Sequence, residues 1–226
     1  MSFASTPSIT QRFRESDLSV TERIEVTNAY NDFVLSKVNA GWSAFLLTFM
    51  FSPLSGNYLS KLHQMKGSIE RFYSRLLTRL VRYPSKGELP ILIGMADFPV
   101  PKRRKKSSVM DVIINAGLHF HSILLIPPKS RLRTSLDKHL EENVAVYLGN
   151  RETIDRIDTK PITGGNLYAL TDYVFKSIKR GFSYDQHVLI LPKALSECRD
   201  ENPVDGGASD RTAGKISNWR GRSREA

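Results

Sequence analysis

The chain has 226 residues, enough for one domain of about 150 residues with a sizeable core and flanking segments. Lysine and arginine number 33 against 23 aspartate and glutamate, and this net charge of +10 favours a polyanionic partner, nucleic acid first and an anionic membrane second. The single cysteine, Cys198, excludes an internal disulfide framework and a multi-cysteine zinc site and fits a reducing compartment.

The first part of the chain predicts helices and buried strands. Residues 1–17 mix Ser, Thr, Pro and charge without periodicity, so we expect a flexible N-terminus. A capping box at Ser19 and Glu22 opens a helix that Gly41 ends. Apolar runs over 42–51 and 89–98 predict strands, and apolar residues at steps of three and four between them predict a long helix over 55–83.

Arginines form a second stripe along this long helix, at Arg71, Arg75, Arg79 and Arg82. An ordinary solvated face explains the stripe best, and steering of phosphates is the functional alternative.

The second part of the chain predicts further strands and helices. Val109–Asn115 and Leu118–Ile126 are typical of two strands joined by a tight turn at Asn115-Ala116-Gly117. Beyond them the pattern predicts a helix over 130–142, a strand over 153–159, a helix over 167–180 and a strand over 187–191. The Gly-, Asp-, Arg- and Ser-rich residues 196–226 predict a disordered tail.

These elements together predict an α+β fold, with one antiparallel sheet and helices packed to a face. We expect one domain over 18–195, between the flexible residues 1–17 and the tail 196–226. The N-terminus lacks an apolar segment of signal-peptide length, and no stretch approaches the roughly 18 continuous apolar residues of a spanning helix. We therefore expect a cytoplasmic protein with no membrane partner.

Two histidines stand two residues apart inside an apolar strand, in the segment Gly117–Ile126. Because side chains alternate across a strand, His119 and His121 face the same side and can converge on one metal ion, while Phe120 faces the other. The structural alternative is a pair of half-buried histidines satisfied by hydrogen bonds.

A tyrosine and a lysine follow on a predicted helix, at Tyr173 and Lys176. One helical turn separates them, so the ammonium of Lys176 can reach the phenol oxygen or a phosphate beside it. Packing explains such a pair by default, and the histidine pair is what makes the combination unusual.

The order of these motifs resembles that of HUH endonucleases, the rolling-circle replication initiators, relaxases and related transposases. Phe45-Leu46-Leu47-Thr48 resembles their first motif, His119-Phe120-His121 the second and Tyr173-Val174-Phe175-Lys176 the third. The resemblance covers about 42–192.

The resemblance implies a five-stranded antiparallel sheet that presents both histidines and a third acidic or amide ligand to one Mg²⁺ or Mn²⁺. The ion polarises a DNA phosphate, the tyrosine attacks it, and a 5′-phosphotyrosine and a free 3′-hydroxyl result. It further implies a single-stranded DNA partner at a replication origin or element end. With no Gly-x-x-x-x-Gly-Lys-Ser/Thr loop in the chain, unwinding requires a separate helicase.

Two aspartates compete for the third ligand position. Family members often carry an acidic residue eight positions before the first histidine, and Asp111 holds that position. Asp97 ends the regular strand that follows the long helix, which makes it slightly preferred.

Tyr168 lies five residues before Tyr173, so the two side chains diverge on a helix, and we predict that Tyr168 packs and that the enzyme uses one tyrosine. The basic run Lys102–Lys106 predicts a DNA-contacting loop, with a plain solvated loop or a nuclear import signal as alternatives.

Other functions fit the sequence less well. A non-catalytic nucleic-acid-binding module on a ferredoxin-like sheet needs exposed aromatic residues on the sheet and has no use for paired histidines. A metal-independent phosphodiesterase needs one His-x-Ser/Thr motif on each of two strands. His121 is followed at that spacing by Ile123, and His63, His139 and His187 supply no second copy.

Overall fold

The computed structural model describes residues 18–85, 87–97, 114–149, 152–181 and 184–193. Its first helix, α1 (Val20–Asn39), begins at the predicted capping box. The Ser19 hydroxyl accepts the backbone N–H of Glu22 at 3.2 Å, and the Glu22 carboxylate accepts that of Ser19 at 2.7 Å. The helix ends before Gly41, whose φ of +86° is a conformation that glycine adopts readily.

Five strands form one sheet in the order β4-β1-β3-β2-β5. Their bounds are β1 Ser43–Phe51, β2 Ile91–Asp97, β3 His119–Ile126, β4 Ile154–Ile162 and β5 Val188–Leu191. Every neighbouring pair is antiparallel. The predicted five-stranded antiparallel sheet is therefore confirmed, with β3, the histidine strand, at its centre.

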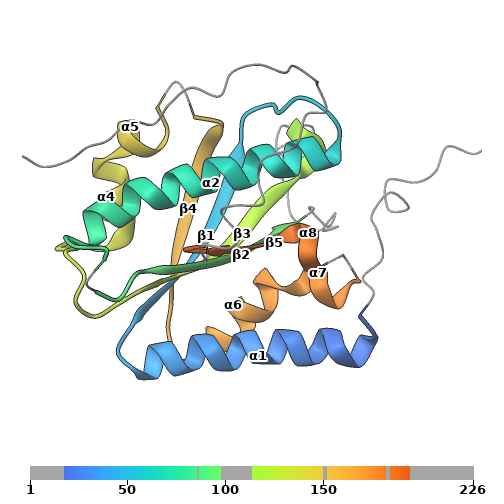
Figure 1. The fold of residues 1–226 in the computed structure, drawn as a ribbon, viewed down its shortest axis with the longest axis horizontal. Helices are drawn as coiled ribbons and strands as arrows, with labels where there is room; N and C mark the ends of the chain where they lie inside the picture. Colours follow the sequence, from blue (N-terminus) through green and yellow to red (C-terminus); the bar gives the residue numbers. More distant parts are fainter. Residues whose placement is uncertain (1–17, 86, 98–113, 150–151, 182–183, 194–226) are drawn as a thin grey trace, which may run out of the picture. The chain divides into compact units, whose positions relative to one another are not determined.

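Helices cover both faces of this sheet, so the prediction that they pack to a single face is wrong (Figure 1). One face carries α2 (Tyr58–Leu80), α4 (Leu136–Glu142) and α5 (Val144–Tyr147), and the other carries α1, α6 (Leu167–Val174) and α7 (Lys176–Lys179). A short helix, α8 (Tyr184–His187), leads into β5. The cause is visible in β3, where the side chains of both faces are buried: Phe120 and Leu124 on the α2 side, Ile123 and Leu125 on the α1 side.

The approach to β3 also differs from the predicted hairpin. The predicted turn at Asn115-Ala116-Gly117 is present, but it belongs to a short 3₁₀ turn (Ile114–Gly117) that includes Ile114, assigned to a strand, and residues 109–113 lie outside the described residues. Both edges of β3 are taken by β1 and β2. The Asn115 side chain accepts the Leu54 N–H at 2.8 Å and donates to the Phe51 carbonyl at 3.2 Å, which fixes the turn against the end of β1.

The predicted helix over 167–180 is interrupted at Phe175, which separates α6 from α7. Phe175 is fully buried and stacks on Tyr30 of α1, with ring centroids 4.4 Å apart. The segment that carries Tyr173 and Lys176 is thus held against α1 at its break.

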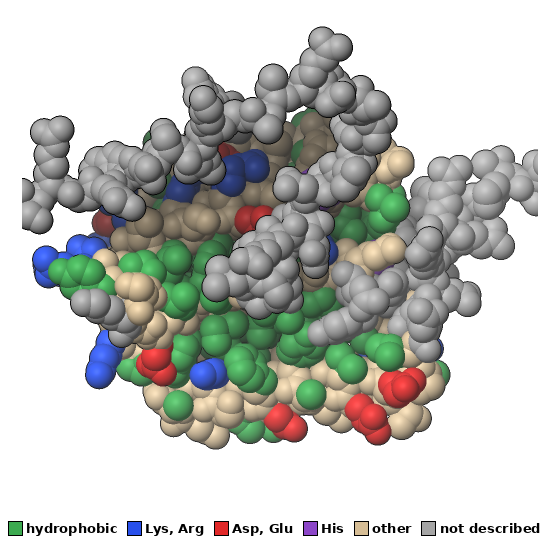
Figure 2. Space-filling view, in the orientation of Figure 1, with side chains coloured by type: hydrophobic (Ala, Val, Ile, Leu, Met, Phe, Trp, Pro, Cys, Tyr) green, Lys and Arg blue, Asp and Glu red, His purple; other side chains and the backbone are tan. Residues whose placement is uncertain are grey.

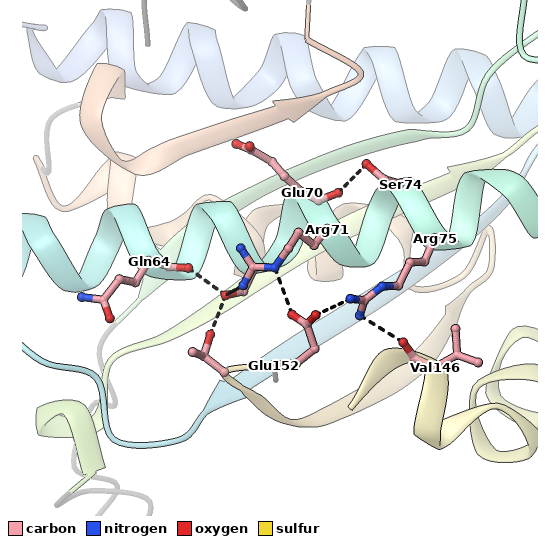
Figure 3. Close-up of polar contacts among 9 residues, drawn as sticks. Gln64, Glu70, Arg71, Ser74, Arg75, Val146 and Glu152 are labelled. Atoms are coloured by element: carbon pink, nitrogen blue, oxygen red, sulfur yellow. Dashed lines mark hydrogen bonds and ion pairs between the residues drawn. The ribbon is translucent and has the colours of Figure 1, made fainter. Parts of the chain in front are cut away.

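Two of the four stripe arginines of α2 form a structural ion-pair network (Figure 3). The carboxylate of Glu152 accepts a hydrogen bond from Arg71 Nε at 3.1 Å and pairs with the guanidinium of Arg75, which also donates to the Val146 carbonyl at 3.0 Å. Burial raises the pKa of Glu152, but the hydrogen bonds from Arg75 and Arg71 outweigh it and hold the pKa below its usual value. Arg71 and Arg75 therefore anchor the start of β4, which favours the structural interpretation of the stripe.

Within the described residues no helix is long and apolar enough to cross a membrane. The described elements belong to a unit that ends at Pro192. The division into 1–17, 18–195 and 196–226 stays a prediction, since residues 1–17 and 194–226 lie outside the described part of the chain.

Candidate metal centre

His119 and His121 lie side by side on the α1 side of the sheet, as the strand period predicts. Their ring centroids are 4.5 Å apart, and the two Nε2 atoms are 2.9 Å apart. His121 is 3% exposed, and His119, at the start of β3, is only partly buried. The pair therefore sits at the end of the sheet, with one imidazole inside the protein and one closer to solvent.

Asp97 completes the cluster from the neighbouring strand. It is the last residue of β2 and pairs in register with His119. Its Oδ2 lies 3.6 Å from His119 Nε2 and 3.7 Å from His121 Nε2, and the residue is 1% exposed. Asp111, the alternative third ligand, lies outside the described residues.

Hydrogen bonds on the far side of each imidazole orient the rings. His119 Nδ1 donates to the Gly117 carbonyl at 2.9 Å, which leaves the lone pair on Nε2. His121 Nδ1 is 3.0 Å from the Thr48 hydroxyl, across the β1–β3 register. Since a hydroxyl both donates and accepts, Thr48 satisfies His121 in either tautomer. Thr48 thus has a specific partner in the site, beyond its place in the predicted first motif.

The electrostatic setting keeps His121 neutral at pH 7. Burial lowers the pKa of its imidazole well below the usual value, and electrostatic interactions with the neighbouring His119 and Lys176 lower it further. A neutral imidazole is the form that binds metal, so no proton has to be displaced from His121 at neutral pH.

The three donor atoms fit one divalent ion. All lie within 4.8 Å of one another, and donors about 2.1 Å from an ion at right angles are about 3.0 Å apart, close to the separation of the two Nε2 atoms. Two imidazoles and a carboxylate suit Mn²⁺ and other first-row ions better than Mg²⁺, which prefers oxygen.

Two residues of α7 contact the Asp97 carboxylate. The Ser177 hydroxyl donates to Oδ1 at 2.9 Å. Oδ2 is buried and accepts no regular hydrogen bond. It forms an ion pair with the ammonium of Lys176. Nothing in the sequence marks Ser177, because a serine after a lysine on a helix is common.

Tyr173 lies at the open side of the cluster. Its ring centroid is 4.6 Å from that of His121, the Lys176 ammonium is 4.0 Å from the ring centroid, and the residue is 37% exposed. Tyr173 and Lys176 are therefore close together as predicted, although a helix break separates them. Tyr168 is 53% exposed, so the prediction that it packs is wrong.

No protein-family model matches this chain, and no curated protein or solved structure has significant similarity to it. The arrangement of side chains must therefore carry the functional argument. The basic run Lys102–Lys106 lies outside the described residues, so its predicted DNA contact stays a prediction.

We expect Asp97→Asn to weaken Mn²⁺ binding by more than the roughly 10- to 100-fold typical of losing an outer hydrogen-bond partner of a metal ligand. The change removes the negative charge that faces both Nε2 atoms. Calorimetric titration of Asp97→Asn beside Asp111→Asn measures the difference. If Asp111→Asn has the larger effect, the third ligand is Asp111 and the 91–97 strand has only a structural role.

Proposed function

We propose that this protein is a metal-dependent, sequence-specific single-strand DNA endonuclease and strand transferase that holds the cut 5′ end on Tyr173. The observation that carries the proposal is the placement of the Tyr173 ring 4.6 Å from that of His121, beside the Asp97–His119–His121 cluster. These residues come from two strands and a helix far apart in the sequence. Core packing alone does not explain why a tyrosine, a lysine and three residues of metal-ligand types meet at a partly exposed site.

The proposed reaction is a transesterification on phosphorus. The phenol oxygen of Tyr173 attacks the scissile phosphate, a new O–P bond forms, and the bond to the 3′ oxygen breaks. The 3′ oxygen leaves and takes up a proton, while the phenol proton is lost to solvent. A divalent ion held by Asp97, His119 and His121 supplies polarisation of the phosphate when bound. The phosphodiester energy is retained, so a later strand transfer rejoins DNA without ATP.

Lys176 supports this reaction from beside the nucleophile. Its ammonium contacts both the Asp97 carboxylate and the face of the Tyr173 ring. From that place it can neutralise charge on a phosphate that approaches Tyr173. Because Tyr173 is partly exposed, a flexible single strand can bring its backbone to the phenol.

The charged side chains on the face drawn in Figure 2 limit the path that such a strand can take. Figure 2 shows Asp and Glu side chains along the edge where α1 runs, and the three acidic residues of α1 outnumber its two basic residues, Arg23 and Lys37. This edge therefore offers no basic track to the phosphates of a DNA strand. We therefore propose that the strand reaches Tyr173 over the ends of β2 and β3, away from α1.

The biological role that fits this reaction is rolling-circle replication of a plasmid, phage or mobile element, with a separate helicase as partner. Conjugation and transposition use the same nick.

The proposal is tested by incubating the protein with a pool of single-stranded oligonucleotides and Mn²⁺. We expect a covalent protein–DNA adduct that resists denaturation and is absent in EDTA. Sequencing of the trapped DNA gives the recognised sequence. An absence of adduct across a pool that covers all short sequences contradicts the proposal.

The alternative is a non-catalytic nucleic-acid-binding protein on a ferredoxin-like sheet. Such modules stack bases on exposed aromatic residues of the sheet. Phe120, the aromatic residue between the two histidines, is 0% exposed and packs in the core beneath α2. The alternative gains support if the oligonucleotide pool binds tightly without forming an adduct.

We expect Lys176→Met to slow adduct formation by about 10- to 100-fold while raising Mn²⁺ affinity about tenfold. The ammonium stabilises charge near Tyr173, but it also occupies the Asp97 oxygen that faces the imidazoles. Lys179→Met is the matched control, because Lys179 pairs with Asp172 on the same segment. Rate and affinity that fall together in Lys176→Met contradict this dual role.

A further inference from the structure

The two oxygens of the Asp97 carboxylate have different neighbours. Oδ1 accepts a hydrogen bond from the Ser177 hydroxyl at 2.9 Å. Oδ2 faces both imidazoles, at 3.6 Å and 3.7 Å from their Nε2 atoms, and the ammonium of Lys176. Asp97 and Ser177 are each 1% exposed, so water does not compete for these contacts.

A carboxylate rotates readily about its last side-chain bond, and that rotation changes which lone pairs face a bound ion. The Ser177 hydroxyl opposes the rotation because it fixes Oδ1 toward α7. Lys176 is a weaker constraint, since its long side chain is 20% exposed and its three donors rotate. The short, buried serine therefore restricts the plane of the Asp97 carboxylate more narrowly than the lysine does, although the lysine supplies the charge-assisted contact.

We propose that Ser177 is a positioning residue of the metal centre, which holds Asp97 so that Oδ2 stays directed at His119 and His121. This inference rests on the proposed metal centre. The same hydrogen bond ties β2 to α7, the helix that follows Tyr173. This hydrogen bond, together with the Lys176 ion pair, joins a metal ligand to the segment that follows the nucleophile.

A purely structural role for Ser177 makes a different prediction. A buried hydroxyl that only stabilises the domain affects folding, whereas one that orients a ligand affects metal affinity in the folded protein. Thr171 provides the comparison, because its hydroxyl is also buried and donates to the Leu167 carbonyl at 2.9 Å within α6. No metal-cluster residue takes part in that hydrogen bond.

The test measures free Mn²⁺ by electron paramagnetic resonance during titration of the full chain. We expect Ser177→Ala to weaken Mn²⁺ binding about 10-fold or more, the range seen for outer partners of metal ligands, and Ser177→Thr to restore much of the loss because it keeps the hydroxyl. Thr171→Val should bind Mn²⁺ like the unmodified protein. Circular dichroism and thermal melting establish that each variant is folded at the temperature of the titration.

Two results overturn the inference: unchanged Mn²⁺ affinity in Ser177→Ala, or an equal loss in Thr171→Val. Absence of Mn²⁺ binding by the unmodified protein also overturns it. Failure of the proposed function has a different signature, in which Mn²⁺ binds in a Ser177-dependent manner but no DNA adduct forms. That result supports the inference and leaves the metal centre with another reaction.

Discussion

Replacing either cluster histidine with alanine is expected to abolish Mn²⁺-dependent adduct formation. Each change removes one of three donors, and two remaining donors hold a divalent ion far more weakly. The loss of stability should be larger at His121, because this residue is 3% exposed and hydrogen-bonded to Thr48, whereas His119 is closer to solvent. We expect His121→Ala to lower the free energy of unfolding by about 2 kcal/mol and His119→Ala by less.

His139→Ala is the matched control for these two variants. The His139 imidazole forms a hydrogen bond with the Tyr147 hydroxyl at 2.9 Å, where α4 and α5 meet. No residue of the metal cluster takes part in that hydrogen bond. Its loss should leave adduct formation unchanged. Calorimetric Mn²⁺ titration, gel detection of the adduct and thermal melting separate the loss of the ion from the loss of the fold. Undiminished cleavage by the double variant of His119 and His121 removes the metal assignment.

The shared face of the histidine pair was predictable because its geometry is local, whereas Asp97 was only slightly preferred over Asp111. The two-residue period of a strand places His119 and His121 on one face, and a regular strand ending at Asp97 brings its last residue to the same end of the sheet. The hydrogen bond from Ser177 to Asp97 depends on how α7 packs against β2, which the spacing of residues in the sequence does not indicate. The hydrogen bond between Thr48 and His121 likewise depends on the β1–β3 register.

The errors in the fold prediction have local causes as well. The turn lies at the predicted Asn115-Ala116-Gly117, but it begins at Ile114, and the φ of +55° at Ala116 is a conformation that alanine rarely adopts, so composition gives no signal for this geometry. The break at Phe175 lacks a glycine or proline, the usual sequence signals of a helix end, and coincides with the stacking of Phe175 on Tyr30. The nearly continuous apolar run of β3 indicates that both of its faces are buried. Such a pattern favours helices on both sides of the sheet, in contrast to the predicted single helical layer.

Tyr173→Phe is expected to eliminate the covalent adduct while leaving the domain folded and able to bind Mn²⁺. The substitution removes only the hydroxyl oxygen, and a phenylalanine ring keeps the contacts with His121 and the Lys176 ammonium. Since Tyr173 is 37% exposed, we expect the free energy of unfolding to change by less than about 1 kcal/mol. The measurements are the adduct assay, Mn²⁺ titration and thermal melting on one preparation.

Tyr168→Phe is the control, because Tyr168 is an exposed tyrosine on the same helix as Tyr173. It should form the adduct at the rate of the unmodified protein. Peptide mapping of the trapped adduct then identifies the modified residue directly. Modification of Tyr168 or Tyr184 contradicts the assignment of Tyr173 as nucleophile but leaves the class of enzyme intact. Because the phenol oxygen forms the bond to phosphorus, no residual adduct should survive in Tyr173→Phe, whereas Lys176→Met should retain some.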